Sequence, residues 1–88
     1  MIYYKYDWVH DFENEPVLFF VELDNDRWAQ RILEVYRDGH KSYADNENEH
    51  GTFLGKEPYP SEKEINDGKE FFIVPITKEQ FEIEWNNR

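Results

Sequence analysis

The chain has 88 residues, no cysteine and a formal net charge of −10, from 20 acidic and 10 basic side chains. A field of this sign repels nucleic acid and anionic membrane surfaces, and it attracts basic proteins and cations. Disulfides and thiolate metal sites are excluded. The length predicts one small globular domain over residues 1–88, with a dense core, because such a domain buries only about 60% of its unfolded-chain surface.

The first eight residues, MIYYKYDW, lack the basic start and apolar run of a signal peptide. No stretch of the chain approaches the ~20 apolar residues that are needed to span a bilayer. We therefore expect a soluble, cytoplasmic protein.

The N-terminal quarter predicts two strands. Residues 2–9, IYYKYDWV, alternate strongly, with aromatic side chains at the even positions on one face. A polar loop, HDFENE, follows at residues 10–15. Residues 16–23, PVLFFVEL, are apolar on both faces, which is typical of a central strand entered at a proline.

Residues 25–36 admit two interpretations. Trp28, Ile32 and Val35 have helical spacing, and Asp24 could cap such a helix. The run ILEVYRDGHKSYA also predicts two strands around Asp38-Gly39, a strong tight-turn pair. We favour the hairpin.

Less sheet is expected in the second half of the chain. Residues 45–51 predict a loop, and residues 52–55 a short extended piece. Ser61 and Glu64 have the spacing of a capping box, which predicts a short helix in SEKEIN. Residues 71–76, FFIVPI, predict a strand.

Residues 78–86 are the other ambiguous segment. Phe81, Ile83 and Trp85 alternate as in a strand, but Thr77 and Gln80 have capping-box spacing, so we expect a helix. The fold class is therefore α+β, a small antiparallel β-sheet with one or two short helices, including a C-terminal helix. The side chains expected to be mostly buried are Trp8, Phe19, Val21, Leu33, Val35, Phe72, Phe81 and Trp85.

The acidic stretch YADNENEH, residues 43–50, could be a metal loop, a catalytic cluster or a surface for a basic partner. A calcium loop of the EF-hand type needs a glycine at position 6 and a glutamate at position 12. Counted from Asp45, these positions hold His50 and Lys56. The match fails at both positions, and we expect neither a metal nor a cofactor.

Catalytic chemistry has few candidates in this sequence. No histidine pair has the i, i+4 spacing of a zinc protease, and neither serine lies in a G-x-S-x-G motif. His10 beside Asp11 resembles a carboxylate-oriented base, although neighbours on a strand point to opposite faces. We expect no enzyme; the alternative is a small ligand-binding or enzymatic domain that uses these two residues.

Several segments together carry a resemblance: WVHDFENEPVLFFVELDNDRW, EVYRDGHKSYA, GTFLG, EPYPSEKEIN and ITKEQFEIEW. Over nearly its whole length the chain resembles a bacterial family known only as a domain of unknown function. Small acidic proteins of this kind often resemble the immunity proteins encoded beside polymorphic toxins, including those of contact-dependent growth inhibition. The resemblance implies a class of role and transfers no catalytic residue.

That role agrees with the charge, because an acidic face speeds the encounter of an inhibitor with a basic nuclease-type toxin. We therefore expect an immunity protein that neutralises a cognate toxin, with an acidic adaptor for another basic protein as an alternative. Such an interface takes about 800 Å² per partner. The expected partner-binding carboxylates, on a mobile loop and its neighbours, are Asp24, Asp26, Asp45, Glu47, Glu49 and Glu57. The sequence names no toxin and fixes no oligomeric state.

Overall fold

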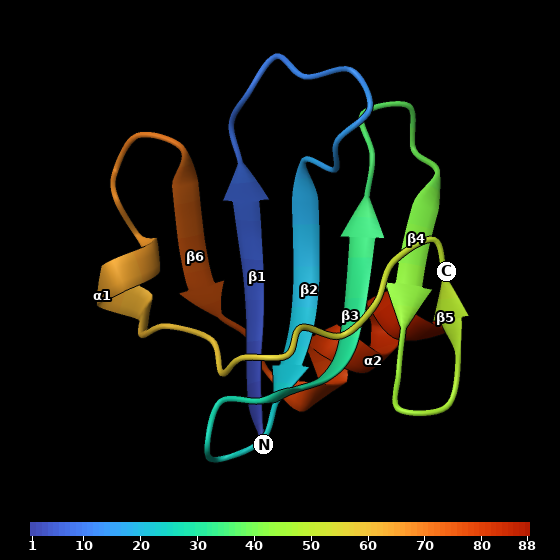
Figure 1. The fold of residues 1–88 in the computed structure, drawn as a ribbon, viewed down its shortest axis with the longest axis vertical. Helices are drawn as coiled ribbons and strands as arrows, with labels where there is room; N and C mark the ends of the chain where they lie inside the picture. Colours follow the sequence, from blue (N-terminus) through green and yellow to red (C-terminus); the bar gives the residue numbers. More distant parts are fainter.

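A six-stranded antiparallel sheet forms the centre of the molecule, in the order β5-β4-β3-β2-β1-β6 (Figure 1). The computed structural model describes all 88 residues. The strands are β1 (Ile2–Trp8), β2 (Leu18–Leu23), β3 (Ala29–Val35), β4 (Lys41–Ala44), β5 (Glu49–His50) and β6 (Phe71–Pro75). Two short helices, α1 (Glu62–Ile65) and α2 (Lys78–Asn86), complete the fold.

Most of the predicted elements are confirmed. Both ambiguous segments adopt the favoured form, a β3–β4 hairpin and a C-terminal helix, and both helices begin with the predicted capping box. Gly39 closes the hairpin turn at φ 94°, a left-handed conformation that glycine adopts without steric cost. The result is an α+β arrangement that consists mostly of sheet.

One prediction for the region between β4 and α1 was wrong. Residues 45–51 are not wholly a loop, because Glu49 and His50 form the short strand β5 on the edge of the sheet. Residues 52–55, predicted to be a short extended piece, lie outside the helices and strands. The turn at residues 45–48 brings the chain back along β4, where Glu49 pairs with Ala44.

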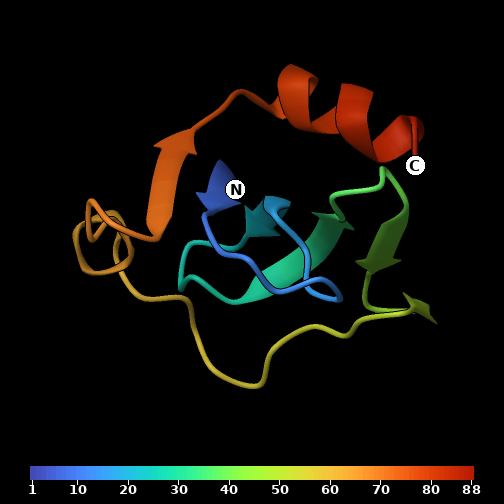
Figure 2. The same cartoon turned by 90° about the horizontal axis from the view of Figure 1, so that it is seen from above.

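The long connection from Gly51 to Pro60 crosses one face of the sheet, and α2 covers the other (Figure 2). Gly51 starts this crossing at φ 83°, and a Cβ there would lie 2.7 Å from the Ser42 hydroxyl oxygen. Only glycine therefore fits at the point where the chain leaves the sheet edge.

Two hydrophobic clusters lie on opposite sides of the sheet. The larger cluster, beneath the connection and α1, consists of Tyr4, Tyr6, Phe19, Val21, Leu23, Ala29, Ile32, Ala44 and Ile73. The smaller cluster, beneath α2, consists of Tyr3, Phe20, Leu33, Phe81 and Trp85. The apolar run of β2 supplies both, which is why this strand is hydrophobic at successive positions.

The predicted core is largely confirmed, with one clear error. Phe19, Val21, Leu33, Phe81 and Trp85 are buried, and Trp8 and Val35 are partly buried. Phe72 was expected to be buried and is 41% exposed. It lies on the α2 side of the sheet but on the outermost strand β6, beyond the part of the face that the short helix covers.

An arginine on β3 fixes α2 to the sheet. The Arg31 guanidinium donates hydrogen bonds of 2.8 and 2.7 Å to Glu22 on β2, and of 2.8 and 3.1 Å to Glu82 on α2. It also lies over the rings of Phe81 and Trp85, 4.7 and 5.2 Å from their centroids. One side chain therefore joins two strands and the helix by ion pairs and by cation–π contacts.

Hydrogen bonds protect the outer edge of β6. Its residues Phe71, Ile73 and Pro75 direct their backbone groups away from β1. Asp67 accepts from the Phe71 amide, the Asn66 side chain donates to the Ile73 carbonyl, and proline has no amide. These contacts occupy two outward-facing groups of the edge strand, and Pro75 has no donor to offer an added strand.

No helix of this fold combines the length and the apolar character that crossing a membrane requires.

We predict that Phe81→Ala lowers the free energy of unfolding by about 3–5 kcal/mol, because the Phe81 side chain is fully buried between α2 and the sheet. Urea denaturation followed by tryptophan fluorescence measures this loss. Ile83→Ala is the matched control on the same helix, where the side chain is 61% exposed, and should change stability by less than about 0.5 kcal/mol. Equal losses in both variants would contradict the packing described above.

We further predict that Glu22→Gln destabilises the protein at pH 7 by about 1–3 kcal/mol, because the charged hydrogen bonds to Arg31 are weakened. Those hydrogen bonds hold the pKa of Glu22 below its ordinary value, with a smaller contribution from the Tyr3 hydroxyl. Because the folded-state pKa is depressed, the stabilisation is present above about pH 4.5 and is lost as the pH falls through the folded-state pKa.

Urea melts of both proteins between pH 7 and pH 3 check this second prediction. The stability difference between wild type and Glu22→Gln should shrink as the pH falls below about 4.5. Glu13→Gln, an exposed loop substitution with no ion pair, is the control and should follow the wild type throughout. A constant difference across the whole pH range would show that Glu22 does not act through its charge.

Candidate functional site

The β2–β3 turn is organised around the carboxylate of Asp24. Its Oδ1 atom accepts hydrogen bonds of 2.9 Å from the backbone amides of Asp26 and Trp28. Asp26 is exposed, and its carboxylate has no partner within the protein. Of the two aspartates predicted here, the first therefore builds the turn and the second is available to a ligand.

Asp45 plays the same part in the β4–β5 turn. Its Oδ1 atom accepts from the amides of Glu47 and Asn48 at 2.9 and 2.8 Å. These backbone hydrogen bonds lower the pKa of Asp45, because they stabilise the ionised form. The turn is thus organised by its own aspartate, and the exposed Glu47 carboxylate projects from it.

Gln30 joins the two turns. Its amide nitrogen lies 3.4 Å from the Asp24 carboxylate, and its amide oxygen accepts a 3.1 Å hydrogen bond from the Asn46 side chain. Both turns lie at the same end of the sheet, at the bottom of Figure 1. The structure thus brings together Asp24, Asp26, Asp45 and Glu47, and we call these four residues the acidic end.

The two remaining predicted residues are placed differently. Glu49 lies on the edge strand β5 opposite Ala44, exposed and next to the acidic end. Glu57 is exposed on the long connection and lines a separate cavity near α1. Five of the six predicted carboxylates therefore lie at or beside this end of the sheet, and Glu57 lies apart from them.

Few of the carboxylates are neutralised by cations of the chain itself. Only Glu22 and Glu82 lie within salt-bridge distance of a lysine or arginine, and both pair with Arg31. Arg27, Arg37 and Lys41 instead donate to backbone carbonyl groups. The negative charge of the surface is therefore largely uncompensated, and it reaches any approaching partner.

His10, the base considered for catalysis, is engaged by the backbone at both ring nitrogens. Nε2 lies 2.8 Å from the Pro16 carbonyl oxygen, and Nδ1 accepts a 3.0 Å hydrogen bond from the Phe12 amide. This pattern assigns the proton to Nε2 and leaves no free nitrogen for a substrate. Asp11 is exposed and makes no hydrogen bond to the ring, so the geometry gives this pair a role in shaping the β1–β2 loop.

No three histidine, aspartate or glutamate side chains converge in a way that could hold a metal ion. In the acidic end, the Oδ1 atoms of Asp24 and Asp45 each accept two backbone amides.

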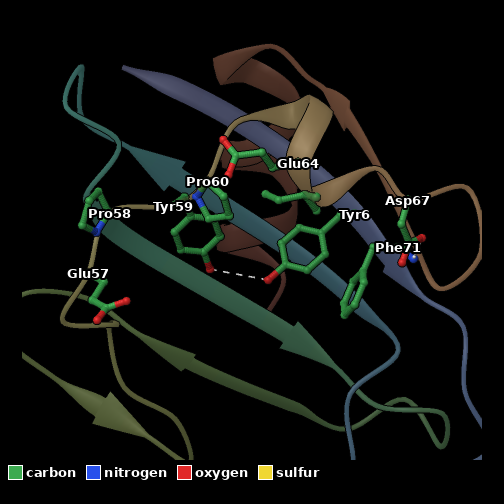
Figure 3. A pocket seen from close by; sticks show the side chains of 9 residues that line it. Tyr6, Glu57, Pro58, Tyr59, Pro60, Glu64, Asp67 and Phe71 are labelled. Atoms are coloured by element: carbon green, nitrogen blue, oxygen red, sulfur yellow. Dashed lines mark hydrogen bonds between the residues drawn. The ribbon is translucent and has the colours of Figure 1, made fainter.

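A second candidate region is a cavity of about 550 Å³ between α1, the long connection and β1 (Figure 3). Its residues combine aromatic rings and prolines with carboxylates and include no basic side chain: Tyr6, Glu57, Pro58, Tyr59, Pro60, Glu64, Ile65, Asp67 and Phe71. The Tyr6 and Tyr59 hydroxyls lie 3.4 Å apart. Burial raises the pKa of both tyrosines, so both remain neutral at physiological pH.

Arg27 holds the wall of this cavity in place. Its side chain donates to the backbone carbonyls of Tyr59 and Pro60 at 3.0 and 2.6 Å, and to the Tyr4 hydroxyl at 3.2 Å. Its own carbonyl accepts from the Tyr59 amide at 2.8 Å. These contacts over-determine its unusual φ of 71°, and they make the cavity a preformed feature of the fold.

Sequence reasoning did not identify Gln30, Arg27 or the cavity tyrosines. The capping box of Ser61 and Glu64 predicted the helix α1, which borders the cavity, but it did not predict which strand lies beside that helix. Nothing in a local pattern shows that Tyr6 and Tyr59, far apart in the chain, face each other.

The chain was compared with known families, curated proteins and solved structures. A family model described as a domain of unknown function, DUF6881, matches residues 2–88. No curated protein and no solved structure gave a match. The family match covers nearly the whole chain, and the protein therefore belongs to the DUF6881 family of domains of unknown function.

Proposed function

We propose that this protein binds a basic protein partner through the acidic end, and that it acts as an immunity protein that neutralises a cognate toxin domain. The observation that carries the proposal is the joining of two acidic turns by Gln30, which presents several carboxylates on a fixed backbone. The resemblance drawn from the sequence motifs supplies the immunity role.

The electrostatics support a basic partner. The net charge is −10, and the carboxylates of the acidic end have no lysine or arginine partner in the chain. A surface of this kind accelerates association with a basic protein and discriminates against acidic ones. A nuclease toxin suits this surface because it must present cations to its phosphate substrate.

The dimensions also support it. The accessible surface of the protein is 5835 Å². An interface of standard size takes about 800 Å² from each partner, or about one-seventh of this total. A shallow depression of about 360 Å³ lies beside Asp45 and Glu47, within the area that such a partner would cover.

The rigidity of the two turns affects affinity as well as rate. Asp24 and Asp45 each consume one carboxylate oxygen in fixing backbone amides. The exposed Asp26, Glu47 and Glu49 therefore start from defined positions, and less conformational entropy is lost when a partner binds. Reversing the charge of Asp24 or Asp45 would disturb the turns themselves, so a clean test spares both.

We predict that the triple variant Asp26→Lys, Glu47→Lys, Glu49→Lys folds normally but associates with a basic toxin at least about tenfold more slowly at low salt. The dependence of its association rate on ionic strength should also flatten, because the steering charges are gone. Stopped-flow association kinetics across a salt series measure both effects.

The matched control is Asp11→Lys, Glu13→Lys, Glu70→Lys, which changes the charge equally at the opposite end of the sheet (Figure 1). It should alter the association rate less than the first variant does. Equal slowing of association in the two variants would show that net charge alone steers the partner. A wild-type association rate in the variant of Asp26, Glu47 and Glu49 would show that the acidic end is not part of the interface.

We also predict that co-expression protects cells from one cognate toxin, encoded next to this protein, and not from unrelated toxins. Colony counts after toxin induction give the readout, with the triple lysine variant of the acidic end as the negative control. Binding to a basic protein without any protection would favour the adaptor role over the immunity role.

A further inference from the structure

The cavity beside α1 contains the same kinds of group that surround Arg31 on the other face of the sheet. There, two carboxylates and two aromatic rings enclose one guanidinium group. In the cavity, the rings of Tyr6, Tyr59 and Phe71 are combined with three carboxylates, and no cation of the chain enters. The two sites differ in that the site beneath α2 contains Arg31, whereas the cavity contains no basic side chain.

Figure 3 shows how the groups are arranged. The rings of Tyr6 and Tyr59 meet at their hydroxyls, Phe71 lies beside Tyr6, and Glu57 and Asp67 appear at opposite ends of the cavity. A flat cation on an apolar stem suits this arrangement. Its face can stack on a ring while its N–H groups reach the carboxylates, which a compact ammonium group does less well.

We propose that this cavity is the binding site for a guanidinium group, supplied by an arginine side chain of the partner protein. The inference rests on the proposed function, and it assigns to that partner a buried contact in addition to the electrostatic one. An arginine in an aromatic-lined cavity is a typical hot spot of a protein interface, because it is desolvated and held on several sides.

The chemistry of the lining favours this occupant. The cavity has the volume of a typical ligand pocket. The hydroxyls of Tyr6 and Tyr59 bond only to each other, so their oxygens retain lone pairs that can accept from a guanidinium group. Three carboxylates without an ion-pair partner give the opening a negative potential. This potential attracts a cation, repels an anionic ligand and does not favour a neutral one.

Two of these carboxylates also have structural roles, which guides the choice of variants. Glu64 accepts from the Ser61 amide and hydroxyl in the capping box, and Asp67 accepts from the amides of Lys69, Glu70 and Phe71. Replacing them with Gln and Asn removes the charges and retains an acceptor oxygen at each position.

The test uses the full chain and N-acetylarginine amide as the probe, followed by ¹⁵N–¹H NMR titration. A single capped residue should bind with a Kd of about 1–10 mM, because it offers few contact atoms. Amide shifts should saturate at Tyr59, Ile65 and Phe71. N-acetylcitrulline amide, which has the same shape without the charge, should bind at least about tenfold more weakly.

The variant Glu57→Gln, Glu64→Gln, Asp67→Asn should lose at least about tenfold in probe affinity. The matched control Asp26→Asn, Glu47→Gln, Glu49→Gln removes the same charge from the other candidate surface and should stay within about twofold of wild type. Absence of saturable shifts, equal binding of citrulline, or an equal loss in the control would each overturn the proposal.

Free L-arginine distinguishes the two sources of a guanidinium group. Binding more than about tenfold tighter than the capped residue would identify a small molecule as the ligand and would overturn the assignment to a partner protein. Similar affinities support that assignment. If the arginine probe does not bind, this inference is wrong, and the result of the protection assay still decides the proposed function. If the probe binds but co-expression gives no protection, only the immunity role is wrong.

Discussion

The ion pairs of Arg31 with Glu22 and Glu82 are the constraint on which the arrangement of the molecule depends. Glu22 is only 7% exposed, and its charge is tolerated because the guanidinium group and the Tyr3 hydroxyl both donate to it. Removal of one partner would leave a nearly buried charge without compensation, which is strongly destabilising. The position of Arg31 on β3 therefore decides where α2 crosses the sheet.

The placement of α2 has consequences for the other elements. The helix is short, so it packs on side chains of β1, β2 and β3 but leaves the β6 end of the same face exposed at Phe72 and Val74. The opposite face has no long helix and is covered by α1 and the connection from Gly51 to Pro60. The connection has an irregular backbone, which Arg27 holds at Tyr59 and Pro60, and it fills less space than a packed helix would. The cavity near Tyr59 results from this incomplete packing.

The charged residues of the chain have distinct structural roles. The arginines contact backbone carbonyl groups, aromatic rings or the buried Glu22, and two of them, Arg37 and Arg88, are exposed. The carboxylates divide into those that shape turns, such as Asp24, Asp45 and Asp67, and those that project freely, such as Asp26 and Glu47. The outer surface is negative because acidic side chains outnumber basic ones by 20 to 10 and few of them are paired, and this excess is the physical basis of the proposed partner class.

The sequence by itself determined most of the elements, because these follow from local chemistry: alternation in β1, the glycine turn at Gly39, and the capping boxes at Ser61 and Thr77. It also identified the acidic residues of the two turns. Only the tertiary structure decided that Gln30 joins them, that Glu57 stands apart, that Phe72 is exposed and that Tyr6 faces Tyr59. These are contacts between residues distant in the chain, and their geometry depends on strand order and helix placement, which periodicity and composition do not specify.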